Sequence, residues 1–358
     1  MNLKYFKYHH PFDLEIGEVL PEITVAYTTF GELNASKSNV IWVCHALTGS
    51  ADVAEWWSGL VGEGKLFDPT EHFIICANVL GSHYGSTSAL SINPKFGTPY
   101  FHDFPFISIR DIVKSFKLLC NHLKINKINT CIGGSLGGQQ AIEMAIMYPD
   151  LVENLILIAT NAQFSPWGIA FNETQRMAIA ADPTWQNNDE NAGRDGLKIA
   201  RAVALLSYRN YQTYSITQQR SDEPLDRKFR AATYQHYQGE KLVSRFNAFS
   251  YWTLTCIMDS HDVGRGRGEV KEVLQTIKAK TLVLGIESDV LFPINEQQFL
   301  AQHIPNARLE IIDSLYGHDG FLIENQLLTK VIRTWQSNNG KLVEPLENYF
   351  KSLDKVLV

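Results

Sequence analysis

Residues 128–149 have the sequence INTCIGGSLGGQQAIEMAIMYP, and this stretch decides the fold. Its first part, 128–134, is a short apolar run that predicts a buried strand. Its second part, 135–149, is predicted to be helical and to end at Pro149. A G-x-S-x-G motif, centred on Ser135, lies where the strand passes into the helix. A serine on so tight a turn needs glycine two residues away on each side, because side chains there would collide. The stretch therefore predicts that Ser135 is a nucleophile.

The rest of the chain extends this strand–helix pattern. Short apolar runs predict strands, and apolar residues at three- and four-residue spacing predict helices. Further strands are expected at 22–31, 38–47, 72–81, 152–160, 279–286 and 307–314, and helices at 107–125 and 325–337. Near-continuous apolar strands separated by helices are typical of a mainly parallel sheet with helices on both faces.

The middle of the chain, residues 164–275, has a different character. It is polar, mostly of helical period and without strands of the core type. We interpret it as a helical lid inserted into an α/β core made of residues 1–163 and 276–358. A chain of 358 residues is longer than single cores usually grow, which agrees with an insertion.

Composition excludes several functional classes. The formal net charge is -6 and is spread without blocks, which argues against nucleic acid or an anionic membrane as the main partner. Five cysteines without a C-x-x-C pair indicate free thiols in a reducing compartment. The N-terminus lacks a leader-like apolar region, and no run of 18 apolar residues occurs, so a cytoplasmic protein is expected. His9 and His10 have no partners at metal-binding spacing, and no metal site is expected.

A serine hydroxyl needs a base, and His318 is the best candidate. It stands in a glycine-flanked loop, SLYGHDGF, after the last expected strand. Asp289, in the loop ESDVLFP after the strand at 279–286, would orient the imidazole. Glu287 and Asp313 are its rivals for this role. The chain order Ser, Asp, His is the order of α/β-hydrolases, so a triad of Ser135, Asp289 and His318 is predicted.

The negative charge of a tetrahedral intermediate requires an oxyanion hole. One donor should be the backbone N–H of Leu136, the residue after the nucleophile. The second should come from a loop after an early strand, and the N–H of Leu47 in HALTG (45–49) is our choice. His45 could act as a second base, but we expect it to shape this loop instead.

Two other features have structural interpretations. GRGRG (264–268) follows no strand and lacks dinucleotide-binding spacing, so Arg265 and Arg267 are expected to be solvated or paired with acids. A role for them in holding a coenzyme A phosphate is the alternative. The aromatic cluster of Trp56, Trp57 and Phe67 is interpreted as core packing.

Seven segments carry a resemblance to a known family. They are 44–65, 75–94, 103–111, 133–141, 237–268, 288–293 and 316–322, and they include CHALTGSADVAEWW, GGSLGGQQA, SDVLFP and YGHDGFL. Together they are similar to the motifs of homoserine O-acetyltransferases, the α/β-hydrolase-fold acyltransferases of methionine biosynthesis. The resemblance covers nearly the whole chain and is much more specific than G-x-S-x-G alone.

The resemblance implies transfer of an acetyl group from acetyl-CoA to L-homoserine by a ping-pong route through acyl-Ser135, with no permanently bound cofactor. It also implies that Arg201 holds the carboxylate of homoserine and Asp319 its ammonium, which suits a guanidinium fork and a carboxylate. Arg209 competes with Arg201 for this role. Members of the family are typically homodimers that associate through the lid.

The chain departs from the family pattern at positions that carry no catalytic group. Leu136 and Gln139 stand where methionines are common, Asn247 and Phe249 where Asp and Asn are usual, and His83 where cysteine is frequent. The acyl donor and acceptor therefore stay open between acetyl and succinyl groups and between homoserine and serine. A simple serine esterase is the further alternative.

Overall fold

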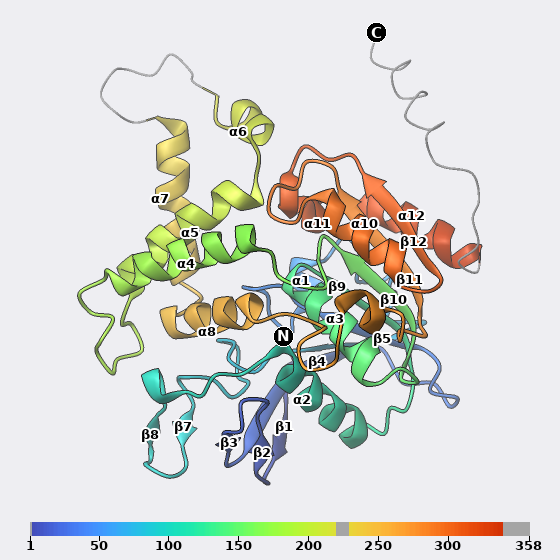
Figure 1. Cartoon of the computed structure of the whole chain (residues 1–358), viewed down its shortest axis with the longest axis horizontal. Coiled ribbons are helices and arrows are strands. Elements are labelled where there is room, and N and C mark those ends of the chain that lie inside the picture. Colours follow the sequence, from blue (N-terminus) through green and yellow to red (C-terminus); the bar gives the residue numbers. More distant parts are fainter. Residues whose placement is uncertain (1, 220–228, 339–358) are drawn as a thin grey trace.

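The computed structural model describes residues 2–219 and 229–338 of the chain. Its centre is an eight-stranded sheet with the order β1-β4-β6-β5-β9-β10-β11-β12 (Figure 1). The strands are β1 (Lys4–Tyr8), β4 (Ile23–Phe30), β5 (Val40–Cys44), β6 (Phe73–Ala77), β9 (Ile128–Gly134), β10 (Val152–Ile158), β11 (Lys280–Ile286) and β12 (Ala307–Ile312). β4 runs antiparallel to β1 and β6, and every other neighbouring pair is parallel. The expectation of a mainly parallel sheet is confirmed.

All seven strands expected from the sequence are present, and six of them are shorter than expected. The largest differences are at 38–47 and 72–81, where β5 ends at Cys44 and β6 at Ala77 and the chain leaves the sheet as a loop. The edge strand β1 was not anticipated. Its sequence, KYFKY, places lysines and aromatic rings in largely exposed positions rather than forming an apolar run. Two short hairpins were also missed, β2–β3 (Phe12–Asp13, Val19–Leu20) and β7–β8 (Ile92–Asn93, Thr98–Pro99).

Helices cover both faces of the sheet. α2 (Ile109–His122), α3 (Leu136–Met147) and α10 (Ile294–His303) pack with one apolar cluster, and α1 (Val53–Trp56) and α12 (Asn325–Ser337) pack with another. β5 illustrates the division, because Trp42 belongs to the first cluster and its neighbours Ile41 and Val43 to the second. The chain therefore forms a three-layered α/β core, as the sequence predicts.

Between β10 and β11 the chain leaves the sheet for residues 164–275, the segment that the sequence predicts to be a lid and that is called the lid below. This segment contains α4 (Pro166–Ala180), α5 (Arg194–Tyr208), α6 (Tyr211–Thr217), α7 (Arg230–Val243), α8 (Ala248–Asp259) and α9 (Val270–Leu274). Figure 1 shows α4 to α8 gathered beside the sheet. The chain enters and returns side by side, because Phe164 N–H donates to His261 O at 2.9 Å and Val263 N–H to Ala162 O at 3.0 Å. Residues 220–228 of the expected lid and 339–358 of the expected core lie outside the described residues.

Three short helical turns complete the described chain: η1 (Phe101–Asp103), η2 (Gly317–Asp319) and α11 (Gly320–Ile323). In the described ranges, none of the helices combines the length and the apolar character that crossing a bilayer requires.

Candidate active site

Ser135 sits on a strained turn between β9 and α3. Its φ of 56° and ψ of -127° place a non-glycine residue in a region that side chains rarely adopt. A Cβ on Gly133 would lie 2.2 Å from the carbonyl oxygen of Gly137, and one on Gly137 would lie 2.2 Å from that of Cys44. Both positions of the motif therefore admit only glycine. Ser135 N–H donates to Ile158 O at 3.0 Å, which fixes the turn against β10.

The base and the acid expected from the sequence are joined directly. His318 Nδ1 lies 2.7 Å from Asp289 Oδ2, and both side chains are buried. The other carboxylate oxygen, Oδ1, accepts hydrogen bonds from the backbone N–H groups of Leu291 at 2.8 Å and Phe292 at 2.9 Å. Stacking of the Phe292 ring on the imidazole, with centroids 5.0 Å apart, adds a second constraint on its orientation. Asp289 thus fixes the orientation of His318, whose Nε2 has no hydrogen-bond partner among the described residues.

The two rival acids lie elsewhere. Glu287 and Asp313 are both exposed, whereas Asp289 is 4% exposed. Glu287 follows β11 directly, and its N–H pairs with Ile312 O of β12 at 3.0 Å, so its backbone still continues the sheet. Geometry therefore favours Asp289 over both alternatives.

Ser135 and His318 line the same pocket, of about 170 Å³. No hydrogen bond joins Ser135 Oγ to the imidazole in the part of the chain that the structure describes. Hydrogen bonds between catalytic groups often tighten only when substrate binds, so shared lining of one pocket is the relevant test. Leu47, Arg201 and Asp319 line the same pocket. Five of the seven residues expected at the site therefore line it, and the other two are Leu136 and Asp289.

Leu136 and Asp289 do not line the pocket themselves. Leu136 is the first residue of α3, where backbone N–H groups have no acceptor within the helix. That N–H belongs to the peptide next to the nucleophile, as an oxyanion donor requires. The N–H of Leu47 has no acceptor among the described residues, although its residue is only 6% exposed.

His45 shapes the loop of Leu47, as the sequence analysis expects. Its Nδ1 lies 2.9 Å from Ala46 O, and its Nε2 accepts a hydrogen bond from Val79 N–H at 3.1 Å. These partners fix a neutral ring, with the proton on Nδ1. Burial lowers the pKa of His45 to about 4, so the ring is unsuited to act as a base near neutral pH.

Arg201 and Asp319, which are expected to bind the carboxylate and the ammonium of the substrate, have different partners in the structure. Asp319 Oδ2 lies 2.7 Å from Arg209 Nε, so the competitor arginine pairs with the expected ammonium site. Arg201 lies over the ring of Tyr208 at 5.5 Å and has no carboxylate partner among the described residues. Since Arg201 lines the pocket and carries an unpaired charge, it is the better candidate for a substrate carboxylate.

Tyr208, Trp56 and Arg245 are among the residues of the pocket wall that were not expected from the sequence. Tyr208 packs against the imidazole of His318, with ring centroids 5.8 Å apart. Trp56 was interpreted as core packing together with Trp57. Trp57 is buried in the core, and Trp56 packs against that core but also lines the pocket and donates from its indole to Ser50 O at 2.8 Å. The tandem of tryptophans was the only sequence signal for it.

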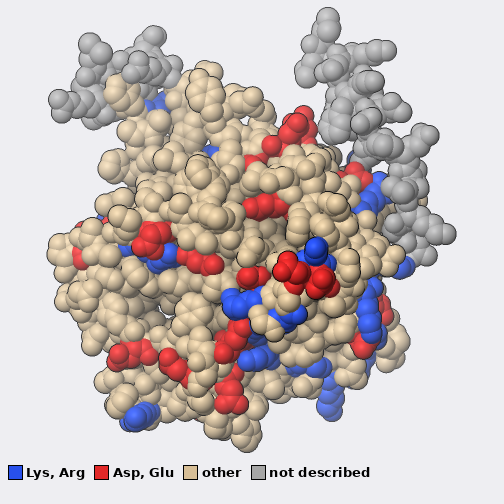
Figure 2. Space-filling model, in the orientation of Figure 1, with Lys and Arg blue, Asp and Glu red and all other residues tan. Residues whose placement is uncertain are grey.

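The GRGRG segment is neutralised by acids. Arg265 pairs with Glu15 at 2.9 Å, and Arg267 pairs with the buried Glu143. Arg110 bridges both acids, at 2.8 Å to Glu15 and 3.2 Å to Glu143. Figure 2 shows blue and red side chains interspersed near the middle of this face rather than one basic area. These pairs disfavour the alternative that Arg265 and Arg267 hold a phosphate.

Over the described ranges, no three His, Cys, Asp or Glu side chains are grouped as metal ligands would be. His9 pairs with Glu22 at 3.0 Å on an exposed surface.

The fold and the buried Ser–His–Asp arrangement define an α/β hydrolase, and comparison with known proteins agrees. The alpha/beta hydrolase fold family matches residues 39–324. A homoserine O-acetyltransferase of Cyclobacterium marinum is 50% identical over 341 residues, which covers 95% of this chain and 97% of the relative. The crystal structure of homoserine O-acetyltransferase from Bacillus anthracis has a TM-score of 0.85 and 25% identity, over 92% of this chain and 96% of that one.

An acetyl esterase, MekB, is also similar in structure. It has a TM-score of 0.81 and 26% identity, over 92% of this chain and 94% of that one. The sequence similarity is decisive between these relatives. The chain belongs to the homoserine O-acetyltransferase family within the α/β hydrolases.

Proposed function

We propose that the protein transfers the acetyl group of acetyl-CoA to the side-chain hydroxyl of L-homoserine, through an acyl-Ser135 intermediate. The observation that carries the proposal is one pocket lined by Ser135, His318 and Arg201, an arginine without a carboxylate partner among the described residues. The first two supply acyl transfer, and the third supplies recognition of an acceptor that carries a carboxylate. The similarity to homoserine O-acetyltransferases, among them one that is 50% identical, supports the choice of donor and acceptor.

In the first half-reaction, Ser135 Oγ attacks the thioester carbonyl while His318 Nε2 takes its proton. The developing oxyanion is stabilised by the N–H groups of Leu47 and Leu136. The imidazolium is stabilised by Asp289, whose Oδ2 lies 2.7 Å from Nδ1. Collapse of the intermediate breaks the C–S bond, and the thiolate of coenzyme A leaves with the proton from His318.

In the second half-reaction, the hydroxyl of homoserine attacks the acyl-enzyme while His318 takes its proton. Arg201 binds the carboxylate of the acceptor, and Asp319 binds its ammonium. Asp319 already pairs with Arg209. The ammonium of homoserine therefore either binds Asp319 together with Arg209 or displaces Arg209 from it. The product O-acetylhomoserine leaves, and the proton returns to Ser135.

Intact-protein mass spectrometry after incubation with acetyl-CoA alone tests the mechanism and the donor together. We expect a single acetyl adduct on the peptide that contains Ser135 and none in Ser135→Ala. Addition of L-homoserine should remove the adduct and release the acetylated amino acid. A wild-type protein that turns over both substrates without forming an adduct would contradict the acyl-enzyme route.

A simple esterase is the second candidate, and the likeness to an acetyl esterase favours keeping it. The two activities differ in what attacks the acyl-enzyme, which is water in one and an amino-acid hydroxyl in the other. Steady-state rates of CoA release should therefore be compared with water, homoserine and serine as acceptors, and with acetyl-CoA and succinyl-CoA as donors. We expect release from acetyl-CoA to depend on homoserine. Equal release without any amino acid would favour the esterase.

We also propose a homodimer that forms through the lid. Large apolar side chains are exposed on its helices, namely Ile199 and Leu206 on α5, Tyr211 and Ile216 on α6, and Tyr237 on α7. In Figure 2 the coloured surface at the upper left, where α6 and α7 lie in Figure 1, carries few charged side chains. Light scattering of the full chain should give twice the mass of 40.5 kDa. A concentration-independent monomer would contradict the proposal.

We propose a cytoplasmic location on the basis of thiol chemistry. All five cysteines are free, and four are buried in the core, as suits a reducing compartment.

A further inference from the structure

The loop 45–49 must hold the N–H of Leu47 in place if that group is to stabilise an oxyanion. Its core side is well fixed. Gln140 Nε2 donates to His45 O at 3.0 Å, Val79 N–H donates to His45 Nε2 at 3.1 Å, and Gly49 N–H closes a turn onto Ala46 O at 2.9 Å. All of these partners lie in the α/β core or in the loop itself.

The pocket side of the same loop is held from the lid. Arg245, in the segment between α7 and α8, donates from Nη1 to Thr48 O at 2.8 Å and from Nη2 to Thr48 Oγ1 at 3.3 Å. Thr48 is the residue directly after Leu47. In the described chain, Arg245 is the only residue of the lid with a hydrogen bond to residues 45–49.

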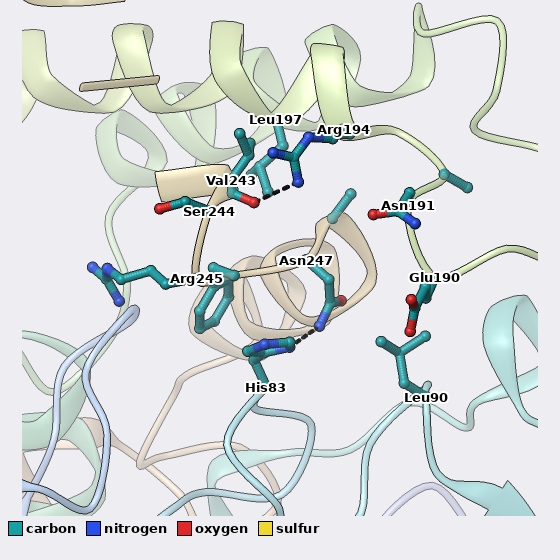
Figure 3. A pocket seen from close by; sticks show the side chains of 13 residues that line it. His83, Leu90, Glu190, Asn191, Arg194, Leu197, Val243, Ser244, Arg245 and Asn247 are labelled. Carbon is teal, nitrogen blue, oxygen red and sulfur yellow. Dashed lines mark hydrogen bonds between the residues drawn. The ribbon is translucent and has the colours of Figure 1, made fainter. Parts of the chain in front are cut away.

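Arg245 is itself well oriented toward this loop. Its Nη1 also donates to Tyr84 Oη at 2.6 Å, and the Tyr84 ring packs edge-on against Phe246 at 5.7 Å. Among the described residues it has no carboxylate partner, so its bonds to Thr48 are not secondary to an ion pair. Figure 3 shows its guanidinium directed away from the neighbouring side chains of His83 and Asn247.

Arg245 also forms a boundary between two hollows. It lines the active-site pocket and, on its other side, a hollow of about 220 Å³ that contains Arg194 and Glu190. A shift of the α7–α8 segment would therefore move the wall of the pocket and release the loop 45–49 in the same event.

We propose that Arg245 is a positioning residue that makes the oxyanion hole depend on the lid. Its two bonds to Thr48 restrain the residue next to Leu47, so that Leu47 N–H, in the Ala46–Leu47 peptide, stays directed at the reacting carbonyl. The core fixes only one side of the loop, and the lid fixes the other. This inference rests on the proposed function, because it needs an acyl-transfer site at Ser135.

Direct binding of an anionic substrate is the competing role for Arg245. A neutral acyl donor separates the two roles, because p-nitrophenyl acetate has no charge for a guanidinium to bind but still forms an oxyanion. The assay is the pre-steady-state burst of p-nitrophenol from the full-length protein, with thermal unfolding as the measure of stability. The variants are Arg245→Ala, Arg245→Lys and Tyr84→Phe. The last of these removes the hydrogen bond between the Arg245 guanidinium and Tyr84 Oη and leaves the charge of Arg245 in place.

Arg194→Ala is the matched control. Arg194 is an exposed lid arginine in the same hollow, but it donates to Val243 O of the lid, at 2.6 Å, and not to the loop 45–49 (Figure 3). Its substitution should leave the burst unchanged. It also reports how much lost lid packing alone lowers the unfolding temperature.

We expect Arg245→Ala to slow acylation by the neutral ester about 10- to 100-fold, somewhat less than complete loss of an oxyanion donor. Tyr84→Phe should slow it by a smaller factor, and added guanidinium ion should partly restore Arg245→Ala. An unchanged burst in both Arg245→Ala and Tyr84→Phe would overturn the inference, as would a rise confined to the KM for acetyl-CoA or homoserine. Absence of a burst in the wild-type protein would instead contradict the proposed function.

Discussion

Replacement of Asp289 by Asn is the most discriminating change at the triad, because the structure predicts a large catalytic loss with little loss of fold. Asp289 Oδ1 accepts two backbone hydrogen bonds, from Leu291 and Phe292, and Oδ2 faces His318 Nδ1. The carbonyl oxygen of Asn can retain both backbone bonds. Its NH2 group then faces Nδ1 and can only donate.

The imidazole must respond by reversing its tautomer. Nδ1 becomes the acceptor and Nε2 carries the proton, so Nε2 can no longer take one from Ser135. The carboxylate charge that stabilises the imidazolium is also lost. In a serine protease the same change lowers kcat about 10⁴-fold, which corresponds to roughly 5.5 kcal/mol of transition-state stabilisation.

We expect Asp289→Asn to lower the rate of acylation by acetyl-CoA about 10³- to 10⁴-fold, with an unchanged circular dichroism spectrum. Stopped-flow acylation and steady-state acetyl transfer measure the loss. Asp313→Asn is the control. Asp313 is the exposed rival acid, so this variant should retain full activity. A loss of less than tenfold in Asp289→Asn, or an equal loss in Asp313→Asn, would refute the assignment.

Two further predictions concern acceptor binding and stability. Arg201→Ala should raise the KM for homoserine about 100-fold or more while acyl-enzyme formation stays within a few-fold of wild type, and unchanged acceptor kinetics would contradict its role. Glu296→Gln tests a buried carboxyl: burial, together with the nearby charge of Asp289, raises its pKa from 4.5 to about 7, although a hydrogen bond from Asn161 opposes the shift. The folded state keeps this proton to higher pH than the unfolded chain, so wild-type stability should fall between pH 4.5 and 7. The free energy of unfolding of Glu296→Gln, measured by urea titration, should accordingly exceed that of the wild type by about 1–3 kcal/mol at pH 8 and by little at pH 5. A difference that does not change with pH would exclude this explanation.

The central sheet was predictable because its strands are covered on both faces. Strands such as β9 and β10 are apolar along nearly their whole length, which distinguishes them from the amphipathic helices between them. The elements that were missed lack this signal. β1 is an edge strand with exposed lysines, and α10, INEQQFLAQH, is mostly polar and buries only Gln297 and Leu300 fully. Their places depend on partners far away in the sequence.

A candidate triad could be selected from the sequence, because glycine crowding and chain order restrict the choice strongly, and the structure pairs two of its members, His318 and Asp289. Partner choice among charged side chains was not. Arg201 and Arg209 lie eight positions apart, and the sequence cannot tell which of them reaches Asp319. The choice depends on how α5 is rotated against η2. Arg245 was missed for a related reason, because its partner Thr48 is 197 positions away.

α5 and the residue that follows it supply three side chains near the proposed acceptor site. Arg201 and Tyr208 lie on the helix, and Arg209 is its C-cap residue. The seven-residue interval between the first two is close to two helical turns of about 3.6 residues each, so they share one face. Inserting one residue between them would rotate the second by about 100° and separate the pair, while leaving the sheet that carries Ser135 untouched. Related enzymes can therefore acquire different acceptors through changes in the single helix α5, while the residues that carry out acylation stay the same.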